Sequence, residues 1–161
     1  MSSVQMTRSD SILDVVDEMQ HRIAARAYDM FKSHGIAWGD AWEDWFAAER
    51  EVIRKPAVEL SEEDGSYTVL ASLAGVDPKR LHVSIAPQDL AITAEDAHTH
   101  IAKARQVHEC DFRAGSVFRS IHFPRPVDLN RATAELHDGM LTVKAPIVPE
   151  AASKRLDVKV A

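Results

Sequence analysis

Residues 134–146 read AELHDGMLTVKAP, and this stretch decides the fold class. The Asp138-Gly139 pair separates two runs in which apolar and polar residues alternate. A type I′ turn joins adjacent antiparallel strands and needs positive φ at both central residues, which Asp-Gly tolerates. The stretch therefore predicts a β-hairpin, whose apolar faces consist of Ala134 and Leu136 before the turn and Leu141, Val143 and Ala145 after it.

The same period of two begins at Val58. Short alternating runs follow one another, separated by turn residues such as Pro87-Gln88-Asp89, while Glu62-Glu63-Asp64 is interpreted as a solvated turn. The apolar positions of these runs are Tyr67, Val69, Ala71, Leu73, Leu81, Val83, Ile85, Leu90 and Ile92. Short strands with frequent turn signals are typical of two packed antiparallel sheets. Residues 57–146 are therefore predicted to form an antiparallel, immunoglobulin-like β-sandwich.

Before Pro56 the apolar residues recur at helical spacing instead. The pattern predicts one helix over residues 11–34, capped by Ser11, and a second from Asp40 to about Arg54. Residues 1–56 thus form a helical hairpin region, an αα-hairpin too small to bury a full core alone, so it must pack on a partner surface. After the sandwich, residues 147–161 read as an extended tail.

Three motifs together resemble the α-crystallin domain of small heat shock proteins. Residues 134–146 are similar to the family's closing A-x-L-x-D-G-x-L-x-V-x-x-P signature. Residues 115–124, GSVFRSIHFP, resemble its G-S-F-x-R-x-F-x-L-P strand, with Val117 and Ile121 replacing the usual aromatics. Residues 73–83, LAGVDPKRLHV, resemble L-P-G-V-x-x-x-x-I-x-V, with Ala74 in place of the usual Pro.

This resemblance implies an ATP-independent chaperone, or holdase, that binds partly unfolded client proteins and limits their aggregation. It implies a homodimer, joined by a strand exchanged within the Glu95–Phe112 loop, that assembles into larger homo-oligomers. The dimer interface would contain Arg119, Asp111 and Phe112, although Asp111-Phe112 stands where many members have Glu-Arg. An Arg among apolar strand neighbours also needs a carboxylate partner unless it lies on a solvated sheet face.

The tail carries Leu156-x-Val158 where the family has its I-x-I motif. These anchors would add to a sheet edge as an extra strand, in a groove lined by Leu81, Val83 and Ile85 from one strand and Ala134 and Leu136 from another. Two other interpretations of the tail stay open: Val158 and Val160 are the anchors instead, or the tail is a passive terminus.

The helical hairpin has a resemblance of its own. Residues 23–28 and 43–49, IAARAY and EDWFAAE, resemble a short bacterial domain of unknown function with the signature I-A-x-x-A-Y, then G, then E-D-W-x-x-A-E. It implies a bacterial protein and no biochemical activity. The apolar residues Trp42, Trp45 and Phe46 are predicted to contact clients or other subunits.

Composition narrows the function classes. The chain has 161 residues and a net charge of −6, which disfavours nucleic acid as a partner. Its apolar runs are too short to span a membrane, and its lone Cys110 fits the reducing cytoplasm. The spacing of His98, His100, His108 and Cys110 fits no zinc template, so no metal and no cofactor are expected. Catalytic and phosphate-binding motifs are absent from the sequence, which predicts that the protein is not an enzyme.

Two other functions stay open. The first is a sandwich-type co-chaperone or adaptor that binds a folded protein partner, which a monomeric mass in solution would favour. The second is a hydrolase with a diffuse site, which turnover screening would detect.

Overall fold

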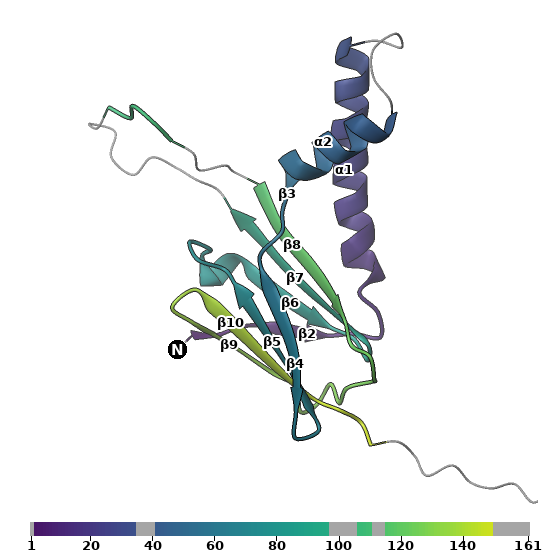
Figure 1. Cartoon of the computed structure of the whole chain (residues 1–161), viewed down its shortest axis with the longest axis vertical. Helices are drawn as coiled ribbons and strands as arrows, with labels where there is room; N and C mark the ends of the chain where they lie inside the picture. Colours follow the sequence, from purple (N-terminus) through teal and green to yellow (C-terminus); the bar gives the residue numbers. More distant parts are fainter. Residues whose placement is uncertain (1, 35–40, 97–105, 111–114, 150–161) are drawn as a thin grey trace, which may run out of the picture.

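The computed structural model describes residues 2–34, 41–96, 106–110 and 115–149 (Figure 1). It contains two helices, α1 (Leu13–His34) and α2 (Ala41–Val52), and a 3₁₀ turn, η1 (Pro78–Arg80). The strands within these ranges are β1 (Ser2–Ser3), β2 (Met6–Arg8), β3 (Ile53–Arg54), β4 (Val58–Glu63), β5 (Ser66–Ser72), β6 (Leu81–Ile85), β7 (Asp89–Asp96), β8 (Gly115–His122), β9 (Thr133–His137) and β10 (Met140–Pro146).

The strands form two sheets that pack face to face as a β-sandwich, which confirms the predicted fold class. One sheet has the order β1-β9-β10-β5-β4 and the other β2-β6-β7-β8-β3. Strands β4 to β10 pair antiparallel, and only the short strands β2 and β3 pair parallel with their neighbours β6 and β8. The sandwich thus comes from residues 58–146, and the N-terminal region adds a short strand to three of its edges.

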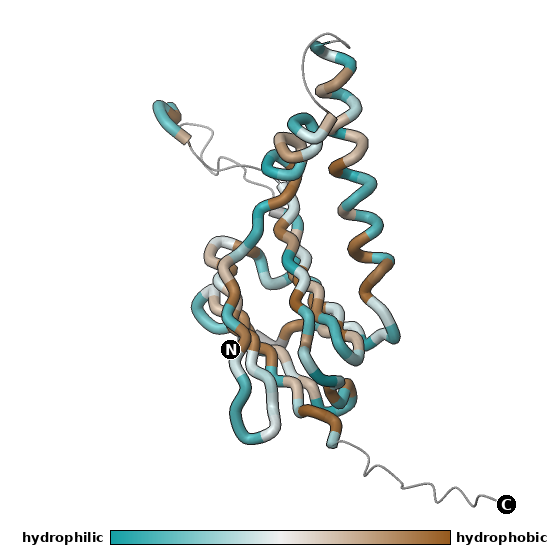
Figure 2. Tube along the Cα trace, turned by 45° about the vertical axis from the view of Figure 1, so that its right-hand side comes forward, coloured by the Kyte–Doolittle hydropathy of each residue, from teal (hydrophilic) through white to brown (hydrophobic). Residues whose placement is uncertain are grey.

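The core lies between the sheets and follows the predicted alternation. In β5, Tyr67, Val69 and Ala71 are buried while the residues between them are partly exposed. Tyr67 stacks on Phe123, with ring centroids 5.4 Å apart. Hydrophobic stretches of the chain accordingly gather along the strands and recur along α1 (Figure 2). Each fully buried Leu, Ile or Val side chain contributes roughly 1.5–3 kcal/mol to folding.

Two Asp-Gly turns close the hairpins of the first sheet. In the β9–β10 turn, Asp138 and Gly139 have φ of 48° and 76°, as the type I′ prediction requires. The β4–β5 turn uses the same pair, Asp64 and Gly65, with φ of 50° and 72°. Only one of the two glycines is crowded, because a Cβ on Gly139 would lie 3.0 Å from the Cα of Ala74.

The helical hairpin packs on the chain's own sandwich. Helix α1 begins at Leu13, two residues later than predicted; the carbonyl of Ile12 accepts the first helical hydrogen bonds, and Ser11 Oγ accepts one from the amide of Leu13 at 3.1 Å. Ile12 forms a small apolar cluster with Ala86 and Ala91, on the face of β7 that points away from the core. Helix α2 ends at Val52, earlier than predicted, because the next two residues pair with the start of β8. The hairpin stands beside β7 and β8 and extends past the end of the sheet (Figure 1).

Candidate functional site

The residues predicted to line the groove lie on β6 and β9, which belong to different sheets and pair with the short N-terminal strands β2 and β1. The structure brings all five predicted groove residues together, because they belong to or pack against one apolar core cluster. The side chains of Leu81, Val83, Ile85 and Leu136 are buried, and Ala134 is half-buried. These residues project from the inner faces of two strands, so the groove opens between the two sheets.

Residues 2–8, here called the N-terminal segment, fill this groove. Ser2 and Ser3 pair antiparallel with β9, opposite Leu136 and Glu135. Residues 6–8 pair parallel with β6, so that Met6 lies opposite Val83. The segment crosses from one sheet to the other, and in Figure 1 it is the purple strand between β6 and the β9–β10 hairpin. The free edges of β6 and β9 are therefore closed by the chain itself.

Two apolar side chains of the N-terminal segment pack against the core cluster. Val4 and Met6 are partly buried, while Gln5 between them and Thr7 after them are exposed. This alternation is what an added strand shows when one of its faces covers a groove. The groove thus holds an apolar residue, one spacer and a second apolar residue.

Polar contacts fix the end of the N-terminal segment. The guanidinium of Arg8 donates from Nε to the carbonyl of Leu129 at 2.6 Å and from Nη2 to the carbonyl of Ala132 at 3.2 Å. The amide of Ser9 donates to the carbonyl of Ile85 at 2.9 Å. Arg8 thereby ties the segment to the loop that leads into β9.

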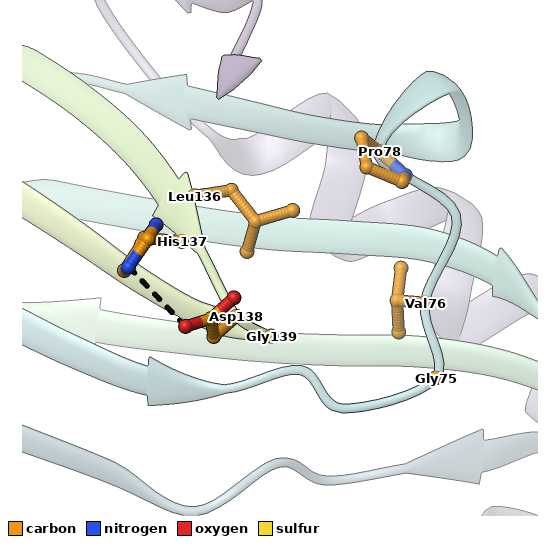
Figure 3. Close-up of a pocket in the computed structure, with 7 residues that line it drawn as sticks. All are labelled: Gly75, Val76, Pro78, Leu136, His137, Asp138 and Gly139. Carbon is orange, nitrogen blue, oxygen red and sulfur yellow. Dashed lines mark ion pairs between the residues drawn. The ribbon is translucent and has the colours of Figure 1, made fainter. Parts of the chain in front are cut away.

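A pocket of about 360 Å³ lies at the end of β9, next to the position of Ser2. Figure 3 shows that it is framed by the β9–β10 turn on one side and by the segment before β6 on the other. Its lining consists of Gly75, Val76, Pro78, Leu136, His137, Asp138 and Gly139. Two neighbouring lining residues form an ion pair, in which His137 Nε2 lies 3.2 Å from Asp138 Oδ2. Across the described part of the chain, no three His, Cys, Asp or Glu side chains gather into a metal site.

The opposite side of the sandwich is open. Strand β4 ends its sheet, and nearly all of its side chains are exposed, including Leu60 at 37%. Glu62 of this strand pairs with Arg125 from the loop after β8. Within the described ranges, no strand pairs with the outer edge of β4.

Arg119 lies in β8 on the inner face of its sheet. Its side chain is on the same face as those of Val117 and Ile121, two residues away on either side. Those two side chains are buried, whereas Arg119 is half-buried. Among the residues that the structure describes, none offers the Arg119 side chain an ion pair or hydrogen bond. The other two predicted interface residues, Asp111 and Phe112, lie outside the described residues, as do the tail anchors Leu156 and Val158.

The three predicted aromatic contact residues of α2 do not share one face. Trp45 is half-buried and packs against the cluster of Met19, Ile23, Ala48 and Ile53. Trp42 and Phe46 instead point outward, 67% and 50% exposed, and stack with ring centroids 6.3 Å apart. The reason is that Asp44 and Ala48 turn toward α1, where Asp44 Oδ1 lies 2.7 Å from Nε2 of His34.

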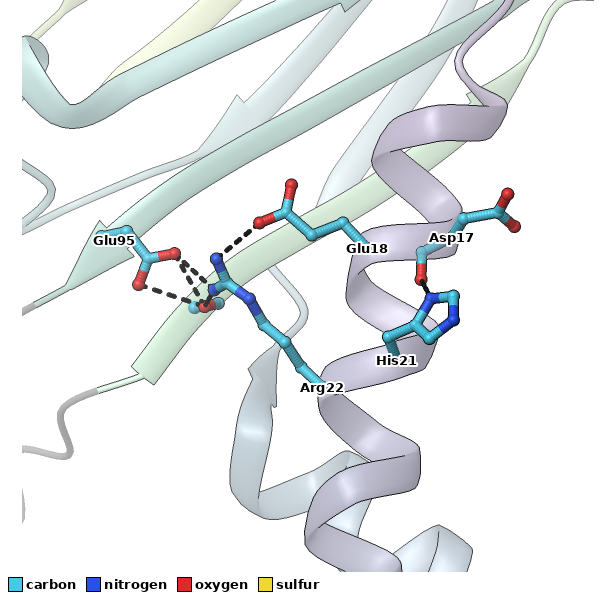
Figure 4. Close-up of polar contacts among 6 residues, drawn as sticks. Asp17, Glu18, His21, Arg22 and Glu95 are labelled. Atoms are coloured by element: carbon cyan, nitrogen blue, oxygen red, sulfur yellow. Dashed lines mark hydrogen bonds and ion pairs between the residues drawn. The ribbon is translucent and has the colours of Figure 1, made fainter.

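Arg22 joins the hairpin to the sandwich. Its guanidinium reaches from α1 to Glu95 at 2.6 Å and to the hydroxyl of Ser116 at 2.8 Å, while Glu18 holds it from the preceding helical turn at 2.8 Å (Figure 4). The hydrogen bond to Glu95 is the largest cause that raises the pKa of Arg22 above its ordinary value. Glu95 and Ser116 flank the segment between β7 and β8, so Arg22 bridges the two ends of that loop.

With this geometry known, the chain can be compared with characterised proteins. The model of the Hsp20/alpha crystallin family matches residues 59–161, from the start of β4 onward. This chain belongs to that family. The match covers the sandwich that the three sequence motifs identified, and helices α1 and α2 precede it.

Relatives of this family member include two bacterial proteins. The spore protein SP21 of Stigmatella aurantiaca is 28% identical over 103 residues, which cover 64% of this chain and 61% of the relative. The small heat shock protein C4 of Rickettsia felis is 26% identical over 106 residues, which cover 66% of this chain and 65% of the relative. The aligned regions thus span less than two thirds of either relative.

Solved structures of the family share the sandwich. The small heat-shock protein from Xylella fastidiosa is similar with a TM-score of 0.52 at 25% identity, covering 65% of this chain and 96% of that one. The hspA protein from Xanthomonas axonopodis has a TM-score of 0.51 at 26% identity, covering 61% and 98%. Heat shock protein 16.0 from Schizosaccharomyces pombe, at 24% identity, has a TM-score of 0.55 over 67% of this chain and 99% of that one, which shows the fold.

The position of the N-terminal segment over β6 and β9 was not predicted from the sequence. One signal was present, because Val4-x-Met6 has the same spacing as the tail anchors Leu156-x-Val158.

Neither helix in the described part of the chain is long and apolar enough to cross a membrane.

Proposed function

We propose that this family member is an ATP-independent holdase that binds partly unfolded proteins in the cytoplasm and limits their aggregation. The observation that carries the proposal is the Hsp20/alpha crystallin match over the whole sandwich, which places the chain in a chaperone family. Preferential binding of unfolded chains lowers their free concentration by mass action and needs no nucleotide. Nucleic acid, membranes, cofactors and catalysis have no part in this proposal.

The stacked pair Trp42 and Phe46 is the proposed client contact. Trp42 is two thirds exposed and Phe46 is half exposed, and both rings lie on the side of α2 that faces away from α1. Large exposed aromatic surfaces are uncommon on soluble proteins and mark binding sites. Trp45, which packs inside the hairpin, has a structural role in this proposal.

The open side of the sandwich is the proposed dimer interface. The outer edge of β4 offers unpaired backbone groups to a strand from the Glu95–Phe112 loop of a second copy. The half-buried Arg119 would gain a carboxylate from that copy, with Asp111 and Phe112 at the same interface. The tail anchors Leu156 and Val158 would then link dimers into larger oligomers through the groove of β6 and β9.

Light scattering of a heat-denatured model client tests the holdase proposal. We expect stoichiometric amounts of the protein to suppress scattering equally with and without ATP. Trp42→Ser with Phe46→Ser should weaken the suppression several-fold. Tyr28→Ser, which removes another exposed aromatic from α1, is the matched control. A full-length protein that leaves scattering unchanged at every ratio would contradict the holdase proposal, and a monomeric mass would then favour the adaptor function.

A further inference from the structure

We propose that the N-terminal segment is the resident occupant of the groove, and that it must leave before the groove takes a tail from a second copy. The inference rests on the proposed function of the groove as the docking site of the tail. It goes further by making residues 2–8 a built-in competitor, so that the exposure of the groove is regulated by the chain itself.

Geometry makes the two occupants mutually exclusive. Strands β6 and β9 each have one outer edge, and the N-terminal segment pairs with both. A strand edge offers a single row of backbone donors and acceptors, so a second strand cannot pair there at the same time. The tail therefore docks only on a groove that the segment has left.

The two candidate occupants present the same side-chain pattern. Val4 and Met6 are separated by one residue, and both pack on the core cluster that contains Val83 and Leu136. The tail repeats this spacing with Leu156-x-Val158. In an extended strand, residues two apart lie on the same face. The groove therefore fits an extended segment with an aliphatic residue, a spacer and a second aliphatic residue.

The hold on the N-terminal segment is small enough to be reversed. It consists of two residue pairs on β9, three on β6 and two partly buried side chains. Arg8 adds the contacts to Leu129 and Ala132. Two residues after Met6 the segment carries Arg8, whereas a tail running in the same direction carries Val160 two residues after Val158. Arg8 is thus the contact that favours the segment over the tail.

A disulfide between the segment and β6 tests the occupancy directly. Thr7 and Ser84 are register partners in adjacent strands, whose typical spacing of about 4.8 Å suits a disulfide. The full-length chain with Cys110→Ser, Thr7→Cys and Ser84→Cys should form this bond intramolecularly on mild oxidation, as mass spectrometry of the digested protein can check. Failure of the bond to form would overturn the inference.

Binding of a labelled peptide of residues 151–161 tests the competition. The host is the full-length chain with Leu156→Ala and Val158→Ala, so that its own tail does not interfere. The disulfide between Thr7→Cys and Ser84→Cys, here called the lock, is then introduced into this host together with Cys110→Ser. Forming the lock should weaken peptide binding at least 20-fold, and reducing it should restore binding. Unchanged binding by the locked chain would overturn the inference.

Two further variants open the groove in graded steps. In the same host, Val4→Ser with Met6→Ser should tighten peptide binding about tenfold, and Arg8→Ala about threefold. Arg131→Ala is the control, because it removes one positive charge from the loop that Arg8 contacts and leaves the N-terminal segment unchanged. Tightening by Arg131→Ala equal to that by Arg8→Ala would overturn the role of Arg8.

The disulfide and the peptide separate two failures. A lock that forms in high yield, together with no peptide binding by any variant, contradicts the tail docking proposed above and leaves the segment as a permanent part of the sandwich. A lock that fails, together with tight peptide binding by the unmodified host, contradicts only the competition. Far-ultraviolet circular dichroism of each variant checks that the sandwich is intact.

Discussion

The two sides of the sandwich end in opposite ways. At one side, β6 and β9 are closed by residues 2–8 of the same chain, and the residues beneath are buried. At the other side, no strand among the described residues covers the edge of β4, whose side chains are exposed, and β3 pairs with the start of β8. Within the described part of the chain, one side of the sandwich is thus covered and the other is not.

The difference separates two kinds of association. An open edge pairs with another chain as soon as the two meet, so dimer formation through β4 needs no prior step. A filled groove adds the cost of removing its occupant, which lowers the apparent affinity of any competitor. We therefore expect a stable dimer whose further assembly is conditional.

Deleting residues 97–108 should have the largest effect, because it removes the strand proposed to pair with β4 of a second copy. We expect monomers at all concentrations, with the circular dichroism of an intact sandwich, since the deletion lies between β7 and β8 and outside the core cluster. Analytical ultracentrifugation measures the mass. A dimeric deletion variant would show that the open edge is not the dimer interface.

Arg119→Ala should weaken the dimer roughly 30-fold, or about 2 kcal/mol, because it leaves a partner carboxylate unpaired at the interface. The stability of the monomer should change little, since the described residues offer this side chain no partner. Dilution sedimentation and urea unfolding measure the two quantities. A large loss of monomer stability with an unchanged dimer would place Arg119 in the fold and not in the interface.

The two Asp-Gly turns allow a matched comparison of the sides. Gly139→Ala and Gly65→Ala both force a positive φ on alanine, which costs about 1 kcal/mol each. Gly139→Ala adds a contact of 3.0 Å with the backbone of Ala74, whereas nothing lies within 4 Å of a Cβ at Gly65. Urea unfolding should show Gly139→Ala to be less stable by about 1 kcal/mol more. Equal losses of stability in the two variants would mean that the backbone at Ala74 moves away from the new Cβ at no cost in free energy.

Arg22→Ala should have the smallest effect, about 0.5 kcal/mol, because its ion pairs with Glu18 and Glu95 are largely exposed. High salt should erase the difference from the unmodified protein. Hydrogen exchange should rise at residues 115–117 and stay constant at 81–85. Arg26→Ala is the control, because Arg26 pairs with Glu51 inside the hairpin. Faster exchange at 81–85 would mean that the two sides are coupled through α1.

The sandwich and the hairpin could be predicted because their signals are local and repeated. Alternation over β5 and β10 and the Asp138-Gly139 turn each specify a conformation within a few residues. The second Asp-Gly turn, at Asp64-Gly65, was predicted as a solvated turn, and it is an exposed turn in which both residues have positive φ.

The filled groove could not be predicted in the same way. The N-terminal segment has only two apolar residues in a polar stretch, and two alternating positions do not define a strand. The split of the α2 aromatics was equally hidden, since residues 42, 45 and 46 fit one helical face by spacing alone. Their division depends on Ala48 and Asp44 facing α1, which is a property of the packed pair of helices.

The contact of Arg8 with Leu129 spans 121 residues of sequence, and this distance sets the order of events during synthesis. Residues 2–8 leave the ribosome well before β9, whose edge they pair with in the folded protein. Contacts of such long separation form late, because closing a large loop costs entropy before the pairing compensates for it. The N-terminal segment thus waits unpaired until the β9–β10 hairpin has emerged, and the groove is open in every newly made molecule before it is closed.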